Sequence, residues 1–281
     1  MKEQFDVLLD RVSKHVEIKN FGLEKESNTP FVRIVEGPVF YGLPIPLDKP
    51  VTEEIIMEEP DLEKLFFLSI AMILHDILYR YLHTRSVAQH YQYTPKKGDN
   101  VIEVGAFLGY YAMYVAQQVG YDGSVIAIEA IPSNYEILKK NFKTNCPDNA
   151  TGISMAVGDK KGEVVFYQST GQIGSMREDV VAKFSNRYNQ MSVKSDTLDN
   201  ITNDLGLGRI DLMIIQVNGN EVDVLNGASD CLERVGNFAV AAPYSRNGQD
   251  HKAIVTEILS LKGFDVISKE EFVFARNTRL D

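Results

Sequence analysis

NVIEVGAFLGYYAMYVAQQVGYDGSVIAIEAIPSNYEILKKN, residues 100–141, contains two apolar runs of strand length with a glycine turn and a helical pattern between them. The first run covers residues 101–104, and Gly105 and Gly109 bracket the turn that follows it. The second run ends directly before Glu129. Strand, helix and strand in this order predict a right-handed βαβ unit, which places the turn and Glu129 at the same carboxyl edge of a parallel sheet.

The residue types at this edge favour a nucleoside ligand. A turn without large side chains lets a ligand approach the N–H groups that open the helix, and a carboxylate about 20 residues further on accepts hydrogen bonds from a ribose diol. The interval from Gly109 to Glu129 has this length. The turn reads GAFLG instead of GxGxxG, and Phe107 and Leu108 leave less room for a pyrophosphate. A dinucleotide oxidoreductase is therefore disfavoured.

At these residues the sequence resembles the class I S-adenosylmethionine (SAM) methyltransferases, and among them the FkbM-type family. Three further segments are similar to that family in the expected order, MAVGDKKGEVVFY at 155–167, SDTLDNI at 195–201 and IDLMIIQVNGNEVDVLNGA at 210–228. Several motifs in the right order are more specific than any single one. The resemblance implies an α/β fold with a Rossmann-like doubly wound sheet, mostly parallel with an antiparallel last strand, and SAM as the cofactor.

The resemblance also implies a set of cofactor-binding residues. Glu103, inside the first strand, would lie beneath the methionine moiety and pair with its ammonium, since an isolated buried charge is costly. Glu129 would bind the ribose, and Asp159 would face the adenine amino group. The other residues of this predicted site are Gly105, Ala106, Phe107, Gly109, Ala130, Gly158 and Gln216. The three carboxylates are expected to gather around one adenosyl group.

The sequence departs from the family pattern at the end of the fourth strand. FkbM-like proteins commonly have Lys-Ile-Asp-Val-Glu-Gly there, whereas residues 214–219 of this chain read IIQVNG. The amides of Gln216 and Asn218 cannot act as a base or as an anionic metal ligand, and no metal site is expected. Glu221 and His251 are the predicted catalytic residues. The alternative for His251 is an ordinary surface position at a helix N-terminus.

Two functions stay open on the sequence. The first is a SAM-dependent methyltransferase that transfers a methyl group in line to a small-molecule or sugar-like acceptor, with oxygen favoured over nitrogen. The second is a catalytically inactive SAM- or nucleoside-binding protein that acts as a sensor or partner subunit.

Composition restricts the partners and the compartment. The chain has 281 residues and a net charge of −10, so no attraction to nucleic acid is expected. Cys146 and Cys231 are its only cysteines, which favours a reduced, cytoplasmic compartment over a disulfide framework. The most apolar run, residues 65–74, is shorter than the ~20 residues needed to cross a bilayer, so no membrane partner is expected.

Two domains are predicted, an N-terminal extension at 1–95 and the methyltransferase domain at 96–281. Helical spacing marks residues 2–18 and 61–92, and alternating β-branched and aromatic residues at 30–46 predict a hairpin. We interpret the extension as a cap, a lid or a dimer surface, which makes a homodimer through it one option.

Two other segments have ordinary interpretations. His75, His83 and His90 fall on the long helical pattern, where they are expected to divide between core and solvent instead of binding metal. Residues 169–189 mix Gly, Ser and charge, which predicts a loop with a short helix, a candidate lid.

Overall fold

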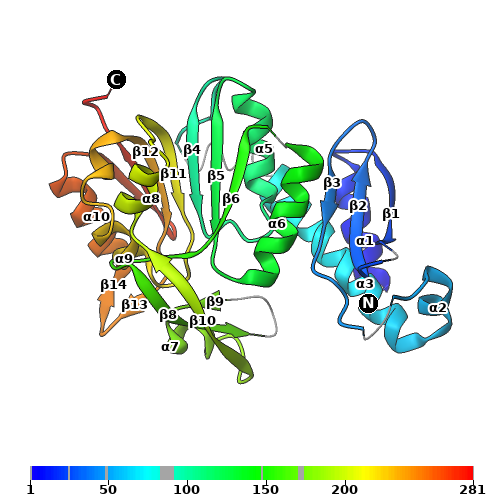
Figure 1. Cartoon of the computed structure of the whole chain (residues 1–281). Coiled ribbons are helices and arrows are strands. Elements are labelled where there is room, and N and C mark those ends of the chain that lie inside the picture. Colours follow the sequence, from blue (N-terminus) through cyan, green and yellow to red (C-terminus); the bar gives the residue numbers. More distant parts are fainter. Residues whose placement is uncertain are drawn as a thin grey trace.

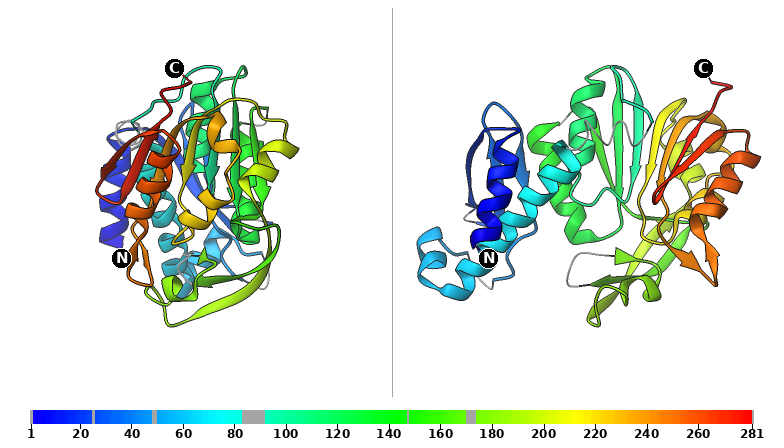
Figure 2. Two further views of the ribbon diagram at one scale, coloured as in Figure 1. Left: turned by 90° about the vertical axis from the view of Figure 1, so that its left-hand side faces the viewer. Right: turned by 180° about the vertical axis from the view of Figure 1, so that it is seen from behind.

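The computed structural model describes residues 2–24, 26–47, 50–82, 92–146, 148–169 and 174–280. A central sheet carries helices on both faces, and an N-terminal unit stands beside one of the two helical layers (Figure 1, Figure 2).

The central sheet has seven strands in the order β15-β16-β12-β11-β4-β5-β6. Its only antiparallel pairs among the described residues are those made by β16, with β12 and with β15. This arrangement confirms the predicted doubly wound sheet with an antiparallel last strand. The strands are β4 Asn100–Val104, β5 Ser124–Glu129, β6 Ala150–Ser154, β11 Ile210–Ile215, β12 Val235–Ala241, β15 Asp265–Lys269 and β16 Phe272–Arg276.

Alternation along the strands gives the sheet two apolar faces, each covered by helices. Val101 of β4 packs in the cluster that includes α5 and α6, whereas its neighbour Ile102 packs in the cluster on the opposite face. The helices are α5 Tyr110–Val119 and α6 Pro132–Asn145 on the first face, and α8 Leu198–Asp204, α9 Glu221–Asn226, the 3₁₀ turn η2 Cys231–Arg234 and α10 His251–Leu261 on the second.

The N-terminal unit packs against α5 and α6 and shares their hydrophobic core. The Phe40 ring meets the Tyr110 ring at 5.0 Å between centroids, and the Val39 backbone N–H donates to Asn145 Oδ1 at 2.8 Å. The unit contains α1 Lys2–Ser13, an antiparallel sheet of β1 Ile18–Glu24, β2 Thr29–Ile34 and β3 Val39–Tyr41, then α2 Glu53–Glu58, α3 Pro60–Asp76 and the π-helix η1 Ile77–Leu82.

The predicted hairpin at 30–46 is confirmed as β2 and β3. The first helix ends at Ser13 instead of residue 18, because β1 begins at Ile18 and pairs with β2. The long helical pattern is confirmed as far as residue 82, and its remainder at 83–91, with His83 and His90, lies outside the described residues. The domain boundary at residue 95 stays a prediction.

A second, smaller sheet follows the third strand of the domain, in the order β7-β10-β8-β9. The predicted short helix within 169–189 is confirmed as α7, but the loop prediction was wrong where β9 and the first two residues of β10 form. Because most side chains at the start of β10 are exposed, that strand has no apolar run to reveal it. The elements are β7 Ala156–Val157, β8 Gly162–Ser169, β9 Gly174–Ser175, α7 Glu178–Val181 and β10 Tyr188–Asp196, and β13 Ser245–Arg246 pairs separately with β14 Gln249–Asp250.

Candidate active site

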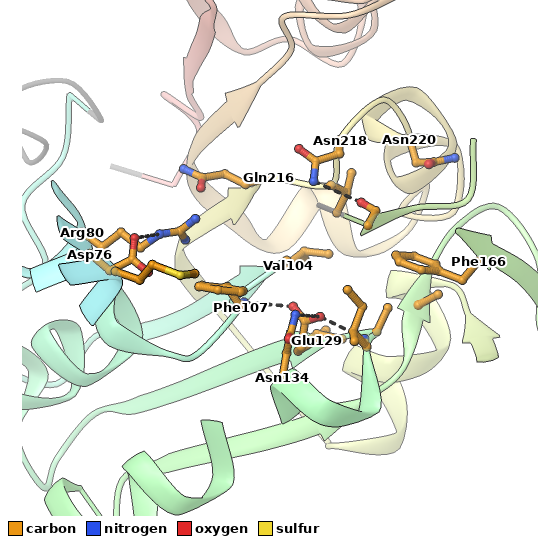
Figure 3. A pocket seen from close by; sticks show the side chains of 18 of the residues that line it. Asp76, Arg80, Val104, Phe107, Glu129, Asn134, Phe166, Gln216, Asn218 and Asn220 are labelled. Carbon is orange, nitrogen blue, oxygen red and sulfur yellow. Dashed lines mark hydrogen bonds and ion pairs between the residues drawn. The ribbon is translucent and has the colours of Figure 1, made fainter. Parts of the chain in front are cut away.

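A cavity of about 580 Å³ lies at the carboxyl ends of β4, β5 and β11. Helices α1 and α3 close its other side, so the N-terminal unit and the central sheet both line it (Figure 3). Ligands of doubly wound sheets bind at this kind of edge, where the strand order reverses. The described lining residues are Phe5, Leu8, Leu68, Ala71, Met72, His75, Asp76, Arg80, Val104, Gly105, Phe107, Ile128, Glu129, Ala130, Ile131, Asn134, Met155, Ala156, Val157, Phe166, Gly174, Met176, Gln216, Val217, Asn218 and Asn220.

The turn after β4 requires glycine at its first position. Gly105 has φ of 85°, and a Cβ added there would lie 2.0 Å from the backbone oxygen of Gln216. The close approach joins the ends of β4 and β11 beneath the cavity. Gly109, with φ of 78°, opens α5, and Phe107 between them adopts a left-handed φ of 55° with its side chain on the cavity. The turn thus exposes one aromatic ring.

Glu129 is held in place by three donors at the end of β5. Its Oε2 accepts the Phe107 N–H at 2.9 Å, and its Oε1 accepts the Ile131 N–H at 2.9 Å and the Asn134 side-chain amide at 3.2 Å. Burial raises the pKa of Glu129, and the two backbone donors oppose that rise. The carboxylate lines the cavity with its orientation fixed, as a ribose ligand requires.

Glu103 is a buried carboxyl group with unused hydrogen-bonding capacity. It is 2% exposed, and its Oε2 has no hydrogen-bond partner among the described residues. Burial raises the pKa of Glu103 to about 8, while the positive charge of Arg80 acts in the opposite direction. An orphaned buried acceptor fits a cationic ligand group at this edge, which is where the ammonium of the methionine moiety is predicted.

The structure brings together only part of the predicted cofactor site. Gly105, Phe107, Glu129, Ala130 and Gln216 line the cavity. Glu103 of β4, and Ala106 and Gly109 of the turn, are not among its described lining residues.

Gly158 and Asp159 lie away from the cavity, in a second depression of about 510 Å³. The chain after β6 continues as β7, which pairs with β10, and this pairing carries Asp159 to an exposed turn where it meets Lys160 at 3.7 Å. Met155, Ala156 and Val157 line the cavity at the place where Asp159 was expected. Asp159 is therefore not among the described residues that line the cavity, and its contact with adenine stays a prediction.

The sequence analysis interpreted the N-terminal extension as a cap, a lid or a dimer surface, but it named no residue of the extension as part of the site. His75, Asp76 and Arg80 of α3 and η1 line the cavity beside Phe107. A signal was present, since a helix with apolar residues on one stripe also places His75 and Asp76 near its end. Their meeting with the sheet edge depends on tertiary packing, which helical spacing does not encode.

The amide of Asn218 has a structural function in the turn after β11. Asn218 has φ of 50°, its Oδ1 accepts the Tyr244 hydroxyl at 3.1 Å, and its Nδ2 donates to the Gly174 oxygen at 3.1 Å. Asparagine tolerates this left-handed conformation better than most residues, and only an amide supplies both a donor and an acceptor. A carboxylate at this position would lose the bond to Gly174.

Glu221 and His251 meet in the protein interior instead of at the cavity. His251 Nδ1 lies 2.8 Å from Glu221 Oε2, and Glu221 Oε1 accepts the Gly219 N–H at 2.7 Å. Arg177 Nη1 lies 3.5 Å from His251 Nε2 and 3.3 Å from the Gly219 oxygen. Neither Glu221 nor His251 is among the described residues that line the cavity. Their catalytic role stays a prediction, and the geometry fits positioning of the 218–219 turn.

The comparison with family models decides the family. The model described as the Methyltransferase FkbM domain matches residues 103–269, more than half of the chain. The chain belongs to the FkbM methyltransferase family. This confirms the family that the sequence resembles, and with it a SAM-dependent methyltransferase domain with SAM as its cofactor.

Individual relatives match shorter or more divergent parts. A protein-L-isoaspartate O-methyltransferase of Methanopyrus kandleri is 38% identical over 66 residues, 24% of this chain and 29% of that protein. The chain thus spans about three tenths of the length of the curated relatives it matches.

Two solved structures are similar at low identity. A SAM-dependent methyltransferase from Aquifex aeolicus is 15% identical with a TM-score of 0.40, covering 68% of this chain and 87% of that one. Aeropyrum pernix fibrillarin with natively bound SAM is 11% identical with a TM-score of 0.43, covering 92% and 98%.

The described part of the chain contains neither a candidate metal site nor a helix that could span a membrane. Within it, no group of three or more His, Cys, Asp or Glu side chains is arranged to hold a metal ion. None of its helices combines the length and apolar character needed to cross a bilayer.

Proposed function

We propose that the protein is an active SAM-dependent methyltransferase that methylates an oxygen of a small molecule with an apolar body. The observation that carries the proposal is that one cavity joins the cofactor edge of the sheet to a second, largely apolar wall from α1 and α3. When bound, SAM supplies an electrophilic methyl group, so the protein's main task is to position the acceptor.

Most of the wall formed by α1 and α3 is apolar and favours an acceptor with an apolar surface. Phe5, Leu8, Leu68, Ala71 and Met72 line it, and none of these side chains offers a hydrogen bond. Leu68 and Met72 are 46% and 37% exposed, so the apolar surface continues toward solvent. Against these five side chains a sugar would leave hydroxyl groups unpaired, whereas an aromatic or alkyl body would bury them favourably. The sequence left a small-molecule or a sugar-like acceptor open, and this wall favours an apolar small molecule.

His75 is the best-placed base for a hydroxyl acceptor. It lines the cavity, its Nδ1 lies 3.6 Å from Asp76 Oδ1, and its ring packs on Tyr79 with centroids 4.4 Å apart. A histidine paired with a carboxylate takes a proton from a hydroxyl group as methyl transfer proceeds, a contribution worth roughly 10²–10⁴-fold. This role replaces the one predicted for His251, which the structure buries elsewhere.

The test is transfer from radiolabelled SAM to a panel of hydroxylated aromatics, long-chain hydroxy compounds and sugars. We expect labelled product from the apolar acceptors, and His75→Gln to lower kcat by about 10²-fold or more without changing affinity for S-adenosylhomocysteine (SAH). Binding of SAH without transfer to any acceptor would favour the inactive sensor instead. Labelling of sugars alone would contradict the apolar acceptor.

A further inference from the structure

Arg80 reaches the cofactor side of the cavity from an unusual segment of backbone. It lies on η1, a π-helical turn of residues Ile77–Leu82 that continues α3. π-Helical turns are rare and are frequently found at functional sites. Figure 3 shows the Arg80 side chain projecting from this helix into the space near Gln216 and Phe107. The segment thus presents a cation to the edge of the sheet.

The guanidinium group of Arg80 contacts Phe107 and Asp76, and its terminal nitrogens have no partner among the described residues. Its Cζ lies 5.0 Å from the centre of the Phe107 ring, and its Nε lies 3.5 Å from Asp76 Oδ1. Arg80 makes no hydrogen bond to any other residue that the structure describes. The aromatic contact and the ion pair therefore orient the group while its two terminal nitrogens stay available.

A buried carboxyl group with an unpaired oxygen lies on β4, two residues before Gly105 of the cavity lining. Glu103 Oε2 is buried and has no partner among the described residues. The positive charge of Arg80 acts to lower the pKa of both Glu103 and Glu129, against the effect of burial. Glu103 itself is not among the described lining residues, whereas Arg80 lines the cavity and offers oriented donors that suit the carboxylate of an α-amino acid. SAM has such a group at the end of its methionine moiety, whereas adenosine does not.

We propose that Arg80 binds the carboxylate of the methionine moiety of SAM, next to the ammonium for which the family resemblance implies Glu103. The inference rests on the proposed function and deepens it, because it makes the N-terminal unit part of the cofactor site. A planar guanidinium donates two parallel hydrogen bonds to one carboxylate, which a lysine cannot reproduce. The family model begins at residue 103, so Arg80 lies outside the matched region.

The test compares two ligands by isothermal titration calorimetry. SAH contains the amino acid group, and 5′-methylthioadenosine contains the same adenosine and thioether without it. We expect Arg80→Ala to weaken SAH binding by roughly 10- to 100-fold and to leave methylthioadenosine unchanged. Arg80→Lys should bind SAH more tightly than Arg80→Ala and more weakly than the wild type, because lysine restores the positive charge but not the two parallel hydrogen bonds of the guanidinium group.

Matched variants separate the explanations. Arg33→Ala, at an exposed arginine of β2 that is not among the described lining residues, should change neither affinity, and Glu129→Ala should weaken both ligands. Equal losses for the two ligands in Arg80→Ala would overturn the inference and assign Arg80 to the packing of Phe107. Unchanged SAH affinity would also overturn it. Failure of the wild-type protein to bind SAH would reject the proposed function itself.

Discussion

The two walls of the cavity are built in different ways. On the sheet wall the ligand-facing groups are fixed by the backbone. An added Cβ at Gly105 would lie only 2.0 Å from the Gln216 oxygen, and Glu129 accepts two backbone N–H groups. On the wall from α1 and α3, side chains such as Leu68, Met72 and His75 project from helix surfaces and are partly exposed. The sheet wall is therefore sensitive to single changes, whereas the helical wall tolerates replacement and can specify the acceptor.

Gly105→Ala should have the largest effect of any change at either wall. The added Cβ would meet the Gln216 oxygen, and φ of 85° is strained for alanine, so we expect destabilisation on the order of 5 kcal/mol or loss of folding. Chemical denaturation followed by circular dichroism measures it. Gly208→Ala is the control, because a Cβ there meets nothing within 4 Å. If Gly105→Ala had the stability of the wild type, the sheet wall would not be more sensitive to single changes than the helical wall.

We expect Glu103→Gln to stabilise the protein at high pH and to weaken its binding of the cofactor. Because the pKa of Glu103 is raised to about 8 from 4.5, the folded protein holds this proton more tightly than the unfolded chain. Its contribution to stability is present below about pH 4.5 and is lost as the pH rises through 8. The variant should thus be more stable than the wild type at pH 9, by up to the order of 4 kcal/mol, and should bind SAH more weakly.

Proton release gives an independent measurement of the same group. At pH 7 most of the Glu103 carboxyl is protonated in the free protein, and an ammonium ligand would lower its pKa. SAH binding should therefore release a proton, detected by calorimetry in buffers of different ionisation enthalpy, and the Gln variant should not release it. Identical proton release in both proteins would remove Glu103 from the cofactor site.

Met72→Ala should have the smallest effect, confined to the acceptor. Loss of part of an apolar wall raises KM for an apolar acceptor by roughly 3- to 10-fold, while the affinity for SAH stays the same. Steady-state kinetics with the acceptor found by the labelling panel measures this. Val7→Ala, an exposed residue of α1 that is not among the described lining residues, is the matched control. A change in SAH affinity in Met72→Ala would show that the two walls are not separable.

The sequence predicted the sheet wall better than the helical wall, for a physical reason. Gly105 and Glu129 follow apolar strands, and the parallel βαβ unit dictates where such residues meet. Asp159 comes two residues after β7, and the pairing of β7 with β10 takes it away from the edge. Arg80 was missed because a residue on a helix reaches the site only through long-range packing, which local periodicity does not reveal.

The pair Glu221 and His251 gives a second example of this difference. Their types and their order along the chain suggested catalysis, and the structure does bring them together at 2.8 Å. Their burial, at 0% and 2% exposure, places them behind the 218–219 turn instead of at the cavity. Residues with catalytic side-chain chemistry can thus be recognised in the sequence. Whether they face the cavity or the interior depends on the tertiary fold.

Titration of SAH into the wild-type protein and Glu129→Ala tests the central claim most directly, namely that the carboxyl edge of β5 holds the ribose of SAM. We predict that the wild type binds and that the variant loses roughly 30-fold or more in affinity, because charged hydrogen bonds to the ribose diol disappear. Thermal unfolding of the variant alone checks that it is folded. Equal affinity of the two folded proteins for SAH would contradict the account.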